Sequence, residues 1–520
     1  MGMVAPQQRI ASAHVVLHGR YGDVSCYAQQ RGVCRQWVYR EAAWVQEVLT
    51  HSPEECQRLR THVRQLQQRQ AELQRLLTRA VVIDDDKQAE VATVGQARGV
   101  TLRDCRALLA VLIPGRVLSI ATLGRRTQAA GVRAGQLLAV VDEVARQRVR
   151  EAAADEIYVK DPVLMVVEPE SLCWISGRLS EEISGTAWER ELAVLPQLEQ
   201  LMRDGGSGLA KGVALVNVQR QAQGREGVVD QGDHFHALRG GRVGVRQAER
   251  QTRTTLAKAE AADKELAACD RQGHKRTGPA VRASAAWKQA EQAMDHWQEQ
   301  ERLWQQTKEA LQLFTPTGEL NTRARAEAVL AETLPRLSDS AFAKSKRPLQ
   351  QPEMLNYLDR VQHKIAALPF AQEIKEVAVH QEGLRRRPEA LRGESPQAAV
   401  LRGILLMGAV VLAKAGAEGQ QAVTTIRDLL RRAYRASSLV ECINSVLRMH
   451  QAGHRQMTQG LLDLKRLYWN CHTFDSGRRR GSTPYQRLGV PWPEGLRWWD
   501  VLQLTPEQLR EKLSTAEKTP

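Results

Sequence analysis

Two carboxylates near the middle of the chain lie beside apolar segments. Asp155 stands at the head of a series of such segments, and Asp204 ends another and is followed at once by Gly205 and Gly206. Neighbouring strands can bring the side chains at their ends together even when these are far apart in sequence. Carboxylate oxygens are the ligands that hard divalent cations prefer. The two acids therefore predict a divalent-metal site.

The segments around these acids indicate a small α/β unit. Short β-branched or continuous apolar runs are typical of strands, and VLMVV suits a strand buried on both faces. Helical spacing of apolar residues from 186 to 195 predicts a helix, which Pro196 should end. The predicted order is β-β-β-α-β. The expected strands cover residues 157–159, 163–167, 172–176 and 198–203.

A third carboxylate lies on an amphipathic helix expected from residue 437 or 438 onward. The apolar face, which should pack on the sheet, consists of Val440, Ile443 and Leu447. Another stripe of the same helix carries Glu441, Asn444 and Arg448. Glu441 can complete the metal site, and Asn444 and Arg448 can contact DNA. The alternative is a surface glutamate on an ordinary amphipathic helix.

Further polar residues could contact a metal or a phosphate. In the motif DHFH, Asp233 and His236 can be accessory site residues, and the alternative is a structural Asp–His pair. Lys211 follows the turn after Asp204 and is a candidate DNA contact. The loop GRRRG, residues 477–481, supplies a further phosphate-binding candidate. Its basic residues are Arg478, Arg479 and Arg480.

The N-terminal residues 21–45 have the pattern of a helix-turn-helix. Ala28 permits close helix packing, Gly32 takes the turn, and Val33 follows it. The second helix, residues 35–44, would reach base edges or phosphates. Its candidate DNA contacts are Arg35, Gln36, Tyr39 and Arg40. The alternative is a helical hairpin without a DNA-binding role.

A heptad repeat follows this region. Its positions are Leu59, Val63, Leu66, Gln70, Leu73, Leu77 and Ala80. The spacing predicts a coiled coil or long helix over residues 54–82, which could pair two chains or pack on its own domain. The acidic run at residues 83–87 reads as a solvated loop rather than a metal site.

Residues 97–150 predict a second helical unit. Pro114-Gly115 breaks an apolar helix, and Ser119 can cap another that runs through Gln128. Arg125 and Arg126 on that second helix are candidate DNA contacts, although the unit could equally be a structural connector. Asp142, in the next amphipathic stretch, is expected at the surface.

Composition limits the classes of function. The 520 residues carry a formal net charge of +15, which favours nucleic acid as a partner, the alternative being a basic but inert surface. The 8 cysteines form no CxxC pair, which argues against a zinc ribbon or a disulfide scaffold and fits a reducing cytosol. The longest apolar run, residues 403–413, is too short to span a bilayer, so we expect a buried helix and no membrane partner.

Residues 241–432 predict a helical block inserted into the α/β unit. Long helices are expected at 246–268 and 280–313, separated by a loop at 272–279. The second helix carries Trp287, Trp297 and Trp304. Tryptophans of this kind are usually core residues, and the alternative is stacking on an unpaired base.

Taken in order, these motifs resemble those of bacterial insertion-sequence transposases, which have an RNase H-like DDE catalytic core and an N-terminal helix-turn-helix. The similar segments are GDVSCYAQQRGVCRQWVYR, DEIYV, VLMVVEPESLCWISG, RDGGSGLAKG, DHFH, RASSLVECINSVLR and LLDLKRLYWNCHTF…STPYQRLG. Asp233 and His236 resemble a D-x-x-H element that some of these enzymes carry.

The resemblance implies a fold, a site and a reaction. The fold is an α/β RNase H-like core, a mixed sheet flanked by helices, with an all-α insertion. Asp155, Asp204 and Glu441 would be the catalytic residues and hold two Mg²⁺ ions, for which Mn²⁺ can substitute. Water would free a 3′-OH at the end of a mobile element, and this 3′-OH would attack target DNA.

The resemblance also implies partners and a location. The DNA partners are the terminal inverted repeats of the element and the target DNA, bound by a homodimer or higher oligomer in the bacterial cytoplasm, associated with the nucleoid. Two alternatives stay open: a non-catalytic DNA-binding protein derived from a transposase, and a structure-selective RNase H-like nuclease. The expected domains are the helix-turn-helix at 1–50, the coiled coil or long helix at 54–82 and the second helical unit at 97–150. The core would consist of 151–240 and 433–490, with the helical insertion at 241–432 between its two parts and a tail at 491–520.

Overall fold

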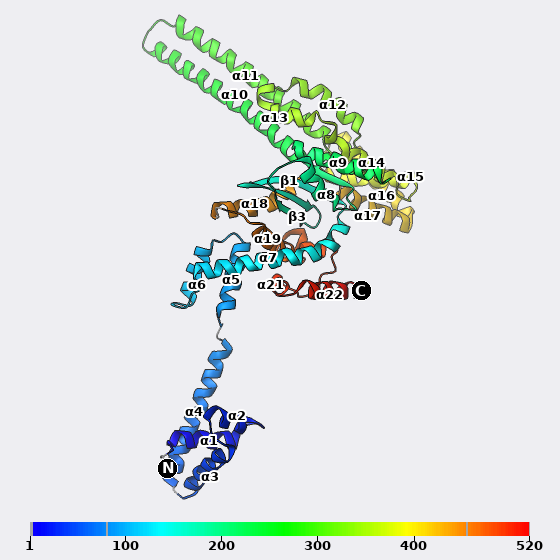
Figure 1. Ribbon diagram of the computed structural model, residues 1–520. Helices are drawn as coiled ribbons and strands as arrows, with labels where there is room; N and C mark the ends of the chain where they lie inside the picture. The colour runs from blue at the N-terminus through cyan, green and yellow to red at the C-terminus, as the bar shows by residue number, and fades with distance from the viewer. Residues whose placement is uncertain (1–3, 52, 80–81, 454–455, 519–520) are drawn as a thin grey trace. The chain divides into compact units, whose positions relative to one another are not determined.

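The computed structural model describes residues 4–51, 53–79, 82–453 and 456–518. It divides into two compact units, Met1–Asp84 and Asp85–Pro520. Figure 1 shows both units and labels most of their helices, together with strands β1 and β3. The first unit is helical, and the second combines one sheet with many helices.

The N-terminal unit contains the two helices expected of the helix-turn-helix. Its helices are α1 (Pro6–His18), α2 (Asp23–Arg31), α3 (Arg35–His51) and α4 (Pro53–Arg79). Gly32 caps α2 with a positive φ of 66°, which favours glycine, and Ala28 is buried. On α4, Leu66 and Leu73 of the heptad seam are exposed. Two further seam positions, the side chain of Leu77 and the residue Ala80, lie outside the described part of the chain.

The second unit is built on a mixed five-stranded sheet with the order β3-β2-β1-β4-β5. Its strands are β1 (Glu151–Val159), β2 (Asp161–Glu168), β3 (Cys173–Leu179), β4 (Gln200–Arg203) and β5 (Val229–Gly232). β1, β2 and β3 are antiparallel neighbours, whereas β1 pairs with β4, and β4 with β5, in parallel. The predicted β-β-β-α-β order is confirmed, and β5 was not predicted.

Helices cover both faces of this sheet, as the continuous apolar run of β2 predicted. On one face Ala152, Leu164 and Val166 pack in a core with α7 (Ile120–Ala145), α8 (Gly185–Ala193) and α9 (Ser207–Ala222). On the other face the alternate residues pack against α18 (Ser438–Gly453) and α19 (Gln459–Cys471). Val440, Ile443 and Leu447 of α18 are buried there, which confirms their predicted orientation.

The helical block between β5 and α18 has its own core. Its helices are α10 (His234–Arg271), α11 (Thr277–Ala310), α12 (Arg323–Arg336), α13 (Asp339–Leu349), α14 (Asn356–Ala366), α15 (Gln372–Arg386), α16 (Pro396–Lys414) and α17 (Gly416–Arg431). α10 and α11 form a long hairpin (Figure 1). Trp304 is buried in the core of the block, whereas Trp287 is partly exposed and donates a hydrogen bond to Asp263.

Shorter elements complete the second unit. Before the sheet lie α5 (Asp85–Ala97) and α6 (Leu102–Leu112), and α20 (Pro484–Leu488), α21 (Trp498–Leu502) and α22 (Pro506–Glu517) end the chain. The 3-10 helices are η1 (Arg146–Arg148), η2 (Pro352–Leu355), η3 (Pro388–Leu391) and η4 (Gly477–Arg479). Ser119 caps α7 as predicted, but α7 continues past Gln128 to Ala145.

Two expectations about burial are wrong. Asp142 is buried because it pairs with the buried guanidinium of Arg466, which also donates to the carbonyl of Trp174. The helix expected to be buried, α16, has few buried residues: Ala398, Leu401, Gly408 and Leu412. Among the described residues, α16 alone has the length and apolar composition of a membrane span.

Candidate functional site

The register between β1 and β4 places the first two predicted acids side by side. Ala154 of β1 lies opposite Arg203, the last residue of β4, and the two strands are parallel. Asp155 and Asp204 are the next residues on each strand. Asp155 is therefore in the middle of β1, not at its head as the sequence suggested, and β4 ends where the chain must turn away.

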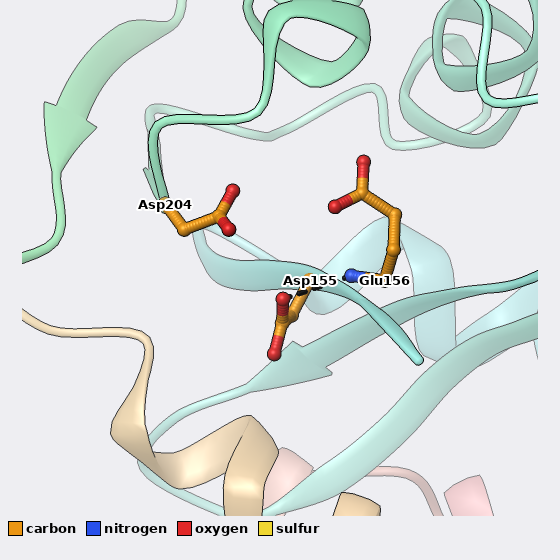
Figure 2. A group of neighbouring side chains, drawn as sticks. All are labelled: Asp155, Glu156 and Asp204. Carbon is orange, nitrogen blue, oxygen red and sulfur yellow. Dashed lines mark hydrogen bonds between the residues drawn. The ribbon is translucent and has the colours of Figure 1, made fainter. Parts of the chain in front are cut away.

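A third carboxylate belongs to this group, and the sequence analysis did not include it. One oxygen each from Asp155, Glu156 and Asp204 lie within 4.8 Å of one another (Figure 2). Glu156 follows Asp155 on β1, so its side chain leaves the opposite face, where Trp188 Nε1 donates to its Oε1 at 2.9 Å. Its position next to Asp155 was the only sequence feature that pointed to it.

The glycine turn after β4 fixes the carboxylate of Asp204. The backbone N–H of Gly206 donates to Asp204 Oδ1 at 2.9 Å, and α9 begins at the next residue. A Cβ on Gly206 would lie 3.0 Å from Asp204 Oδ1 and 3.4 Å from Glu156 Oε2. A side chain at this position would therefore crowd the carboxylates, which explains the need for a small residue.

Helix α18 brings the remaining predicted residues to the same place. Asn444 is fully buried, and its Nδ2 donates to Asp155 Oδ2 at 2.9 Å. Glu441, one turn earlier, is paired with Arg448, whose Nη1 lies 2.7 Å from Glu441 Oε2. Glu441 is not one of the three carboxylates grouped within 4.8 Å, but it lies on the same helix as Asn444, which contacts Asp155.

The Asp–His pair at the start of α10 lies beside Glu441. Asp233 caps α10 by accepting from the backbone N–H groups of Phe235 and His236, and it also accepts from Ser437 N at 3.1 Å. His236 Nδ1 contacts the Asp233 carboxylate, and its Nε2 lies 4.0 Å from Glu441 Oε1. The pair therefore has a structural role as a helix cap and also reaches the candidate site.

Burial and mutual repulsion change the ionisation of these groups. Burial, and then the negative charges of Asp204, Glu441 and Glu156, raise the pKa of Asp155 to about 7. Burial also raises the pKa of Glu156, although the hydrogen bond from Trp188 opposes this. The hydrogen bond to Asp233 raises the pKa of His236, against the effect of burial. The site concentrates negative charge that a cation would neutralise.

The donor atoms fit a hard divalent cation. All three grouped side chains offer carboxylate oxygens, the ligand type of Mg²⁺ and Mn²⁺. Asn444 adds an independent observation, since no described residue donates to its buried Oδ1. A buried polar atom without a partner is costly, and a cation or its bound water would satisfy it. The residues present therefore fit the metal that the sequence analysis expected.

The predicted DNA-contacting residues fall into two groups. Some are exposed: Arg35, Gln36, Tyr39 and Arg40 on α3, Arg125 on α7, Lys211 on α9 and Arg480. Of these, Arg40 also lies 3.6 Å from the carboxylate of Glu41. Others are engaged within the protein. Arg126 pairs with Asp86 at 2.7 Å, and Arg448 with Glu441. The prediction of Asn444 as a DNA contact is wrong, because its side chain is fully buried and donates to Asp155. Arg479 donates to the backbone carbonyls of Pro169 and Glu170, and Arg478 lies 3.5 Å from the Glu170 carboxylate.

Comparison of the chain with protein-family models, with curated proteins and with solved structures gave no match.

Proposed function

We propose that this chain is a DNA transposase with an RNase H-like core, which cleaves and joins DNA strands with divalent metal ions held by Asp155, Asp204 and Glu441. The observation that carries the proposal is that Asp155 and Asp204 come together from the middle of β1 and the end of β4. Helix α18, which carries Glu441, is joined to the same place by the hydrogen bond from Asn444 to Asp155. The mixed sheet with helices on both faces supports the fold that the resemblance implies.

In this proposal Asp155 and Asp204 are the primary ligands, because both are fixed before any ion binds. Asp155 is held by Asn444, and Asp204 by the N–H of Gly206. Bound ions would activate water or a 3′-OH and stabilise charge at the phosphorus during phosphoryl transfer. Glu441 pairs with Arg448 and would exchange this partner for an ion.

Glu156 is a further ligand candidate within the same proposal. One of its oxygens lies within 4.8 Å of an oxygen of Asp155 and an oxygen of Asp204, and Trp188 donates a hydrogen bond to Oε1. Because Glu156 leaves the face of β1 opposite to Asp155, its carboxylate can approach an ion from a different direction than the carboxylate of Asp155. Glu156 would thus share the cation with the two aspartates, or orient water bound to it.

The N-terminal unit supports the part of the proposal that concerns DNA. Arg35, Gln36, Tyr39 and Arg40 are all exposed on α3, the second helix of the expected helix-turn-helix. A helix of this kind reads the major groove through such side chains. The same observation favours a second candidate, a DNA-binding protein without catalysis.

Metal binding separates the two candidates. We expect Mn²⁺ titrated into the protein, followed by calorimetry, to bind with an affinity that falls at least about 10-fold in Asp204→Asn. Glu181→Gln, an exposed residue outside the site, is the control. Binding of DNA without any binding of Mn²⁺ or Mg²⁺ would reject the catalytic proposal and leave the DNA-binding protein.

A further inference from the structure

Helix α16 exposes an extended apolar surface that the proposed function does not use. Its exposed large side chains are Val400, Ile404, Leu406, Met407, Val410 and Val411, with Leu406 and Met407 69% and 67% exposed. Soluble monomers rarely expose contiguous apolar surface of this kind unless it has a partner. The surface therefore needs an explanation beyond the candidate site.

The opposite side of α16 is already packed. Its buried residues, Leu401 and Leu412 among them, face the helical block, and Gln381 of α15 donates to the carbonyl of Leu405. At 100° per residue the six exposed side chains fall within an arc of about 160° centred away from this packed side. The helix thus has two apolar faces, of which only one is covered by described residues of the chain.

The exposed face has the geometry of a helix-pairing surface. Val400, Ile404, Met407 and Val411 follow one another at intervals of four, three and four, the repeat of a coiled-coil seam. Gly403 lies beside this seam, and no atom lies within 4 Å of a Cβ built on it. A small residue there lets a partner helix approach closely. No charged residue interrupts the run from 403 to 413.

We infer that this face pairs with the same face of a second copy of the chain across a two-fold axis. A surface without charge does not repel its own copy, and two-fold pairing is the commonest form of self-association. The six side chains expose roughly 90 Å² each, so a symmetric pair that covered them completely would bury about 1,100 Å², just above the minimum of about 1,000 Å² for a specific interface. The area is thus sufficient for a dimer.

A membrane is a less suitable occupant. The packed side of α16 brings buried Gln381 with it, and Arg402 lies within the first half of the helix, where it donates to the carbonyls of Leu391 and Gly393. Although α16 has the length and apolar composition of a membrane span, insertion would carry these polar groups toward the lipid, which is costly. The uninterrupted apolar run of α16 covers only residues 403–413.

The test is the mass of the full chain in solution, measured by sedimentation equilibrium over a range of concentrations. The double variant Ile404→Glu/Met407→Glu places charges on the exposed face, and it should weaken self-association at least about 100-fold because like charges meet across the axis. The wild type should have twice the 58.2 kDa of the single chain, and the variant should have half the mass of the wild type.

Two control variants make the result specific to α16. Ala409→Glu adds the same charge at an exposed position outside the seam and should leave the mass unchanged. Leu66→Glu/Leu73→Glu tests the heptad seam of α4 and should leave the α16 contact intact. Circular dichroism should show equal folding of all variants.

Three results would overturn the inference. They are a wild type of 58.2 kDa at every concentration, an α16 variant with the mass of the wild type, and co-sedimentation of the wild type with phosphatidylcholine vesicles that the α16 substitutions abolish.

Discussion

Asn444 Nδ2 donates a hydrogen bond to Asp155 Oδ2 at 2.9 Å, although the two residues are separated by 289 positions in the chain. This contact joins α18 to the middle of β1 and fixes one oxygen of a carboxylate that burial and its neighbours already disfavour as an anion. It therefore holds α18, the helix that carries Glu441, against the strand that carries Asp155.

The first prediction concerns Asn444 itself. Asn444→Ala should lower metal affinity and DNA cleavage by about 10–100-fold, because a residue that orients a ligand has effects of this size. DNA binding by the N-terminal unit should not change. Metal titration and a cleavage assay measure the first two quantities, and a gel-shift assay measures the third. Equal cleavage by the wild type and the variant would show that this hydrogen bond is structural only.

The second prediction concerns pH and Asp155. Its pKa rises from 3.8 to about 7, so between these values the metal-free folded protein holds a proton that the unfolded chain has lost. The free energy of unfolding should therefore fall as pH rises through this range, by at most about 1.4 kcal/mol per pH unit. Asp155→Asn should remove this slope. Urea denaturation at several pH values measures it.

Metal affinity should depend on pH in the opposite direction from the free energy of unfolding. Binding of a cation requires the ionised carboxylate, so the affinity for Mg²⁺ should increase with pH up to about 7 and binding should release protons. Calorimetry in buffers of different ionisation enthalpy counts the protons released. A pH-independent affinity over this range would contradict the assignment of Asp155 as a ligand.

The third prediction concerns the buried pair between Asp142 and Arg466. Both side chains are less than one-tenth exposed, and Arg466 joins α19 to α7 and β3. Asp142→Ala should lower the free energy of unfolding by about 3–5 kcal/mol, because it leaves a buried guanidinium without its partner. Glu143→Ala, which removes an exposed ion pair with Arg510, should cost less than about 1 kcal/mol. Similar losses for both variants would contradict this account.

The fourth prediction concerns DNA binding by α3. Arg35→Ala and Arg40→Ala should each weaken DNA binding and reduce the dependence of log affinity on log salt by about 1, if each side chain contacts one phosphate. Arg64→Ala, an exposed arginine on α4, is the matched control. Fluorescence anisotropy with labelled duplexes at several salt concentrations measures both effects. An unchanged salt dependence in all three variants would indicate a helical hairpin without a DNA-binding role.

Much of the sheet could be predicted from sequence, because a strand that is buried on both faces has a continuous apolar run such as VLMVV in β2. The start of β1 could not, since Ala152, Ala153 and Ala154 have little preference for strands. The prediction therefore placed Asp155 at the head of the strand. The pairing of β1 with β4 is set by long-range packing.

Only part of the candidate site could be predicted, because the contacts between its residues depend on long-range packing. Asp155, Asp204 and Glu441 could be chosen by residue type and motif, but the nearness of Glu156 depends on the register of β1 and β4 and on the hydrogen bond from Trp188. Local composition was also a poor guide to burial. The apolar helix α16 is largely exposed, whereas Asp142 is buried because a distant arginine neutralises it.

The central claim is that the acids from β1, β4 and α18 form one metal-dependent catalytic site. The most direct test is Mg²⁺- or Mn²⁺-dependent cleavage of a DNA duplex that carries the sequences flanking the gene. The wild type should be compared with Asp155→Ala, Asp204→Ala and Glu441→Ala, each checked for retained DNA binding, with Glu181→Ala as the control. We expect the wild type and the control to cut, and the three site variants to bind without cutting. A wild type that binds this DNA and never cuts it with either metal would contradict the claim.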